Sequence, residues 1–160
     1  MKGRKCAMRL VIGIGNTLRG DDGIGVAIAQ QLAAQHSAPN LHVITCHQLT
    51  PELIGLISQA EQVIFIDASV QQPLGSVQAV PLRVEAAKEL SAHHTTPSAL
   101  LLAAKVLYGA QPCSTLIAVG AQHFSYGEQF SAPVAAALPR AAKLALTLLN
   151  MPTARSGDLH

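Results

Sequence analysis

The sequence predicts an α/β fold: a single three-layer domain with a mostly parallel, twisted sheet of about five strands and helices on both faces. Strand-like and helical segments alternate along the chain, which is typical of this class. The run VIFI at residues 63–66 is continuously apolar, as in a parallel strand buried on both faces. The length of 160 residues suits one domain. We assign the domain to residues 1–150 and expect residues 151–160, which contain Pro, Thr, Ser and Gly, to form a flexible tail.

The predicted elements follow from apolar periodicity and from the residues that begin and end helices. The pattern predicts strands over residues 10–14, 41–46, 63–66, 76–82 (a short edge strand) and 115–119, and helices over residues 24–36, 51–60, 98–108 and 132–149. Thr50 and Pro51 form a typical helix start, and Gly109 a typical stop. Residues 83–92 are expected to form a surface loop. Pro139 predicts a kink in the final helix or a later start.

The connections predict where a ligand would bind. Right-handed crossovers favour an order in which the first strand lies between the second and the third. Ligands of such sheets bind outside the carboxyl ends of the strands, where the winding reverses. Asp22 follows the first strand and Asp67 ends the third, so we expect the two carboxylates to face each other across that crevice.

Composition excludes several classes of function. The net charge of +2 is small and scattered, which disfavours nucleic acid and anionic membranes as partners. The three cysteines have no C-x-x-C spacing, so neither a disulfide framework nor a zinc knuckle is indicated. We expect Cys46, Cys113 and His123 to be structural or surface residues. No apolar run approaches a membrane span and the basic start fails as a signal peptide, so we expect a cytoplasmic protein without membrane insertion.

The loop after the first strand carries the strongest local signal. The sequence reads GIGNTLRGDDGIG at residues 13–25. The third glycine of a dinucleotide fingerprint is replaced by Leu18, and no G-K-[ST] of a phosphate-binding loop is present. Asp21 and Asp22 would repel a phosphate, although the helix dipole would attract one. A helix cap explains one aspartate but not two in a row, so the motif indicates a site for a cation or a metal centre.

The metal hypothesis needs a third ligand, and His93 and His94 stand before the helix that begins near Pro97. Taken alone, each histidine reads as ordinary loop surface, and Asp67 could instead cap a loop or pair with an arginine. Two carboxylates and an imidazole in one crevice form a mixed oxygen and nitrogen ligand set that suits a divalent first-row metal. Without a cation, the two carboxylates would raise each other's pKa.

At these residues the chain resembles the hydrogenase maturation proteases, endopeptidases that trim the C-terminal extension from the large subunit of nickel–iron hydrogenases. The resemblance covers about residues 9–149. It rests on the loop motif, on VIFIDA at residues 63–68 and on HHTTPSALLLAAKVLYG at residues 93–109. It implies that Asp22, Asp67 and a histidine bind nickel. Gap-free counting back from Gly109 favours His94, with His93 as the alternative, and Asn16 and Asp21 match motif positions.

The resemblance also implies a mode of action. The nickel would be supplied by the substrate, the precursor of a hydrogenase large subunit, and we expect no tightly bound cofactor and a monomer. Either the metal acts as a Lewis acid or activates water, or an acid such as Asp21 serves as a general base. The competing interpretation is a non-enzymatic nickel-binding maturation chaperone that uses the same crevice. A third is a small-molecule hydrolase with an acid pair.

Overall fold

The helices and strands follow the alternation that the sequence predicts. A computed structural model describes residues 7–84 and 95–153. The elements are, in chain order, β1 (Met8–Ile14), the 3-10 turn η1 (Gly20–Gly23), α1 (Ile24–Gln35), β2 (Leu41–Cys46), the 3-10 turn η2 (Pro51–Leu53), α2 (Ile54–Gln59), β3 (Ala60–Ser69), β4 (Val77–Pro81), α3 (Pro97–Tyr108), β5 (Cys113–Gly120) and α4 (Ala132–Asn150).

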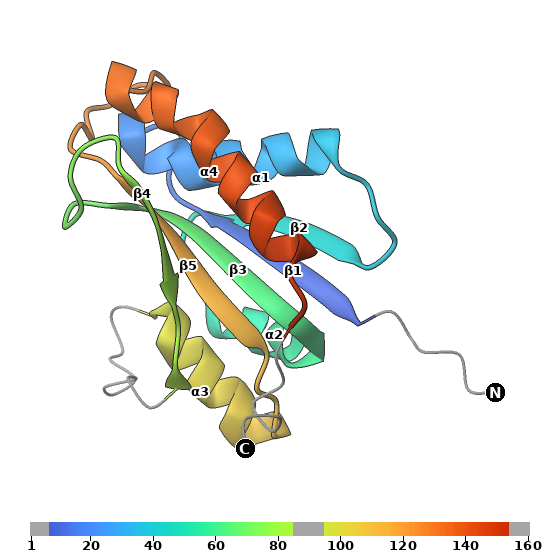
Figure 1. Cartoon of the computed structure of the whole chain (residues 1–160). Coiled ribbons are helices and arrows are strands. Elements are labelled where there is room, and N and C mark those ends of the chain that lie inside the picture. The colour runs from blue at the N-terminus through green and yellow to red at the C-terminus, as the bar shows by residue number, and fades with distance from the viewer. Residues whose placement is uncertain (1–6, 85–94, 154–160) are drawn as a thin grey trace.

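The strands form one sheet between two helical layers. The order is β2-β1-β3-β5-β4, with β4 antiparallel to β5 and the other neighbours parallel. Helices α1 and α4 cover one face, and α2 and α3 cover the other (Figure 1). This arrangement confirms the predicted fold class. It also confirms that the first strand lies between the second and the third.

The sheet separates two hydrophobic cores. Successive side chains of a strand point to opposite faces, so Val11 and Ile64 pack under α1 and α4, whereas Leu10 and Phe65 pack under α2 and α3. Both cores use aliphatic side chains almost throughout, because the chain has no Trp and few other aromatic residues. Strands buried on both faces need apolar residues at every position, which explains the continuous run at residues 63–66.

Most predicted elements lie within one or two residues of their observed bounds, but two differ more. The predicted strand over 63–66 is too short, because β3 spans Ala60–Ser69 and Asp67 lies inside it. Backbone hydrogen bonds to β5 continue from Gln62 to Ser69 regardless of side-chain polarity. The predicted helix over 51–60 is reduced to η2 and the six-residue α2, since Ala60 already pairs with Met8 of β1. The loop expected over 83–92 lies mostly outside the described residues, as does the tail beyond Thr153.

The last helix is continuous from Ala132 to Asn150, so the predicted later start is wrong. Pro139 removes one backbone hydrogen bond to the carbonyl of Ala135. Both residues are exposed, so water can satisfy that carbonyl. By length and composition α4 could also cross a membrane, contrary to the sequence expectation. A stripe of its side chains instead packs against the sheet: Val134, Ala137, Ala141, Ala145 and Leu149.

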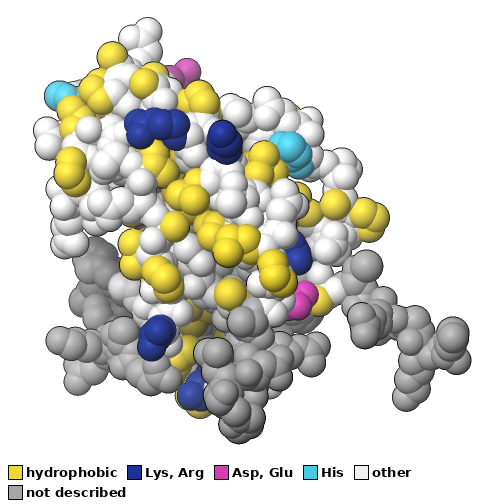
Figure 2. Space-filling model, in the orientation of Figure 1, with side chains coloured by type: hydrophobic (Ala, Val, Ile, Leu, Met, Phe, Trp, Pro, Cys, Tyr) yellow, Lys and Arg dark blue, Asp and Glu magenta, His cyan; other side chains and the backbone are white. Residues whose placement is uncertain are grey.

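Basic side chains are spread out on the face of the molecule that carries α4. Figure 2 shows the Lys and Arg side chains scattered singly over the face that carries α4, without a continuous basic patch. The side chain of one of them, Arg140, donates a hydrogen bond of 2.6 Å to the carbonyl of Gly75 and so fastens α4 to the turn before β4. On this face, therefore, the positive charge serves local structure.

Candidate functional site

The start of α1 lies directly on the carboxyl ends of β1 and β3. A side chain at Gly25 would collide with the carbonyl oxygens of Ile14 and Ile66, and one at Gly13 would collide with the backbone of Gly25. Only glycine allows the helix and the two strands to approach this closely. The glycines of the loop motif therefore bring the acidic turn η1 to the crevice between the first and third strands.

The loop before α1 is closed by its own hydrogen bonds. Gly15 has a φ of 148°, and any side chain there would meet the carbonyl oxygen of Asp22. The backbone N–H of Asn16 donates to Oδ2 of Asp22 over 2.9 Å, and Oδ1 of Asn16 accepts from the N–H of Leu18 at the same distance. Asp22 is half-buried. Its carboxylate is thus held in one orientation at the mouth of the crevice.

Asp67 lies beside this mouth. It follows Ile66, the last β3 residue paired with β1, and it shares a face with Phe65, on the side of α2 and α3. Burial raises the pKa of Asp67 to about 7; the backbone N–H of Ala68 opposes this shift, and the negative charge of Asp22 adds to it. Gly25 at the start of α1 lies against the carbonyl of Ile66, and η1 contacts β3. Asp22 and Asp67 therefore lie on adjoining segments at this edge.

The raised pKa of Asp67 makes stability depend on pH. The folded protein keeps a proton that the unfolded chain loses above its usual pKa of 3.8. The cost of ionising the buried carboxyl is therefore absent below pH 4, grows as the pH rises, and is complete above about 7. We expect Asp67→Asn to unfold at higher urea concentration than the wild type at pH 8, by up to roughly 4 kcal/mol in unfolding free energy. Near pH 4 the unfolding free energies of the variant and the wild type should converge. An equal difference at pH 4 and at pH 8 would contradict the raised pKa of Asp67.

The histidine ligand cannot be placed. His93 and His94 lie outside the described residues, and within residues 7–84 and 95–153 no three His, Cys, Asp or Glu side chains gather as a metal site. The helix that follows is well defined: Thr96 caps α3 by accepting the N–H of Ala99 over 3.1 Å. Its residues Leu100 and Leu101 belong to the core on the side to which Asp67 points. Helix α3 therefore covers the face of the sheet to which Asp67 points.

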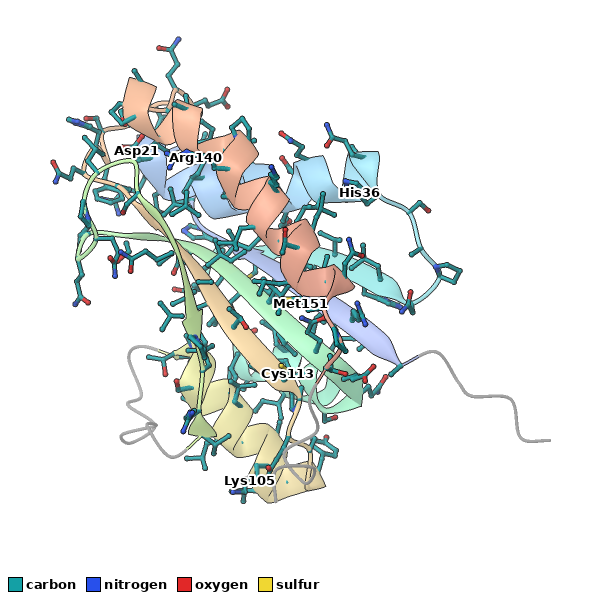
Figure 3. All side chains as sticks on the ribbon, in the orientation of Figure 1. Asp21, His36, Lys105, Cys113, Arg140 and Met151 are labelled. Atoms are coloured by element: carbon teal, nitrogen blue, oxygen red, sulfur yellow. The ribbon has the colours of Figure 1, made fainter. Side chains whose placement is uncertain are left out.

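Asp21 has a different setting from its neighbour. Its side chain is fully buried. Oδ1 accepts the N–H of Ser131 at 2.7 Å, and Oδ2 accepts the Ser131 hydroxyl at 2.9 Å and the N–H of His123 at 3.2 Å. Figure 3 shows Asp21 beside the start of α4, where the helix dipole favours a negative charge. A carboxylate with both oxygens occupied and no exposed surface is poorly suited to be a general base, so this environment speaks against that role for Asp21.

An open hollow of about 400 Å³ adjoins the loop. It lies between residues 15–18 and the end of β2, where Cys46 and His47 line it. Burial raises the pKa of the Cys46 thiol, and the charge of Asp67 adds to the shift. Two hollows of about 410 and 430 Å³ open instead at the opposite edge, near Ala60 and Arg9. The first of these hollows is lined by Asn16, whose N–H is bonded to the carboxylate of Asp22. Cys113 and the side chain of His123 are exposed.

Comparisons with known proteins agree on one family. A family model described as hydrogenase maturation protease matches residues 26–148. The structure is similar to the hydrogenase maturating endopeptidase HybD from E. coli, with a TM-score of 0.77 and 24% identity over 89% of this chain and 91% of that one. It is also similar to the [NiFe] hydrogenase maturation protease HycI from Thermococcus kodakarensis KOD1, with a TM-score of 0.74 and 23% identity over 91% and 94% of the two chains.

A third similar structure is the hydrogenase 2 maturation peptidase from Thaumarchaeota archaeon SCGC_AB-539-E09, with a TM-score of 0.68 and 27% identity over 91% of this chain and 99% of that one. No curated protein sequence matches this chain. The family match begins just after the acidic turn, at residue 26. The motif at residues 13–25 is therefore an observation separate from that match.

Proposed function

Because the chain belongs to the hydrogenase maturation protease family, we propose that it is an endopeptidase that removes the C-terminal extension of a nickel–iron hydrogenase large-subunit precursor after nickel insertion. The observation that carries this proposal is the acid pair at the carboxyl edge. Burial is the main cause of the raised pKa of Asp67, and the negative charge of Asp22 adds to it; a bound cation would offset the repulsion between the two carboxylates. A partner that brings its own metal fits such a site.

The nickel would be recognised as part of the substrate. Carboxylate and imidazole groups are ligands for divalent first-row metals, and we propose Asp22, Asp67 and His94, with His93 as the alternative to His94. These side chains would occupy free coordination positions of a nickel ion already bound by the precursor. Binding the metal would then position the neighbouring peptide bond for hydrolysis, because a fixed orientation removes much of the entropic barrier.

The partner and the setting follow from this proposal. In this proposal the precursor carries its nickel before trimming, and the enzyme acts in the cytoplasm, as a monomer and without a cofactor of its own. The hollow beside residues 15–18 is open to solvent, which suits a large substrate. A small-molecule hydrolase would use a more enclosed pocket.

The test is the mass of the precursor. The wild-type protein is incubated with a nickel-loaded large-subunit precursor, and the intact mass of the precursor is measured over time. We expect loss of one C-terminal peptide, with release that depends on enzyme concentration. Stoichiometric binding with an unchanged precursor mass would instead identify a nickel-binding chaperone.

A further inference from the structure

Two loops that are far apart in the sequence form one continuous surface at the carboxyl edge. The first is the loop from Gly15 to Gly23, and the second is the loop over residues 121–131 between β5 and α4. The N–H of Gly20 donates to the carbonyl of Gly127, and the N–H of Gly127 donates to the carbonyl of Leu18, each over 2.8 Å. The N–H of Asp21 donates to the carbonyl of His123 over 2.9 Å. The two loops are thus joined along their length.

The buried carboxylate of Asp21 locks this pair of loops. It accepts hydrogen bonds from both ends of the second loop, at His123 and at Ser131. The second loop also has its own apolar anchor, because Phe124 packs against the core under α1 and α4. Phe130 of the same loop packs against this core as well, so the conformation of the loop does not depend on its third aromatic residue, Tyr126.

Tyr126 and Leu18 form an exposed apolar pair on this locked surface. Tyr126 is 88% exposed and Leu18 is 46% exposed. The hydrogen bond from Gly127 to Leu18 places the two residues on adjoining backbone. An aromatic side chain on a rigid support loses little conformational entropy on binding, which is why Tyr and Trp dominate the energy of protein interfaces. Neither side chain contributes to the cores.

The position of Leu18 and Tyr126 indicates which molecule would bind them. Leu18 belongs to the same closed turn as Asp22, whose carboxylate is tied to the backbone of Asn16. A folded protein bound at Asp22 would therefore lie next to Leu18. We infer that Leu18 and Tyr126 form a docking patch for the folded protein surface around the nickel of the precursor. This inference rests on the proposed function, and it adds a contact that recognises protein rather than metal.

The experiment separates docking from chemistry. Cleavage of the nickel-loaded precursor is followed with the wild type, Tyr126→Ala, Leu18→Ala and the double variant. The matched controls are Tyr108→Ala and Leu107→Ala, which remove exposed side chains of the same types from the far end of α3, where Tyr108 is 62% and Leu107 66% exposed. Loss of an interface hot spot costs a factor of about ten or more. We expect the double variant to raise KM at least about tenfold, by more than any change in kcat, and the controls to keep wild-type values.

Each outcome decides one claim. An unchanged KM in the double variant, with the wild type active, would overturn the docking patch and leave the proposed function intact. The same rise in KM in the α3 controls would also overturn it, because the effect would then not belong to this edge. A wild type that leaves the nickel-loaded precursor uncut would overturn the proposed function itself.

Discussion

Asp22→Asn is expected to abolish processing of the precursor while the protein stays folded. Asparagine keeps an oxygen that can accept the N–H of Asn16, so the loop stays closed, but the charged ligand is lost. Even residues that only support a metal ligand change activity by 10–100-fold, so loss of a ligand should cost roughly 100-fold or more. The measurement is the rate of precursor cleavage, together with the urea unfolding midpoint.

The control for this variant is Glu52→Gln. Glu52 is an exposed carboxylate in the turn after β2, so its replacement removes the same charge from the same edge of the sheet. It should cleave at the wild-type rate. Normal cleavage by Asp22→Asn would show that Asp22 is not part of the site. An equal loss of cleavage rate in both variants would show that only the negative charge of this edge matters, and not the position of Asp22.

The second large effect concerns the adjacent histidines. His94→Ala is expected to lose most processing activity, and His93→Ala is expected to keep most of it. Adjacent side chains of an extended segment point to opposite sides, so only one of them can readily face the crevice. The gap-free spacing to Gly109 favours His94, and we again expect a loss of roughly 100-fold, measured as the rate of precursor cleavage.

The two histidine variants are each other's control, since both remove an imidazole from the same two-residue segment. If His93→Ala loses activity and His94→Ala keeps it, the proposed site stands, and its histidine ligand is His93. Normal cleavage by both variants, and by the double variant, would exclude this segment from metal recognition.

The fold could be predicted because its main signals are local. The continuous apolar run at residues 63–66 and the glycine-rich loop before α1 indicate buried parallel strands and a close helix start. The order of the first three strands then follows from the handedness of crossovers. The extent of β3 could not be read in this way. Its last residues are held by pairing with β5, which lies more than forty positions away in the chain. The sequence therefore suggests that the strand ends at Asp67, although the strand continues past it.

The role of Asp21 in the site could not be predicted from the sequence either. Asp21 and Asp22 are equivalent in the sequence, yet one faces the crevice and the other is buried beneath a second loop. Two of the three donors to Asp21 are backbone N–H groups, which carry no residue signature. The third is the hydroxyl of Ser131, which stands just before α4 and bonds Asp21 instead of capping the helix. Only the three-dimensional arrangement assigns these donors to Asp21.

The most direct test of the account compares two forms of one precursor. Nickel-loaded and nickel-free large-subunit precursors are incubated with the same amount of wild-type protein, and cleavage is followed by intact mass. Three ligands without a thiolate make an open site, unlike a permanent structural metal site with four closed ligands. We therefore predict that the isolated protein is essentially metal-free by elemental analysis and cleaves only the nickel-loaded precursor. Equal cleavage of both precursors, or stoichiometric metal in the isolated protein, would contradict recognition of the substrate's nickel.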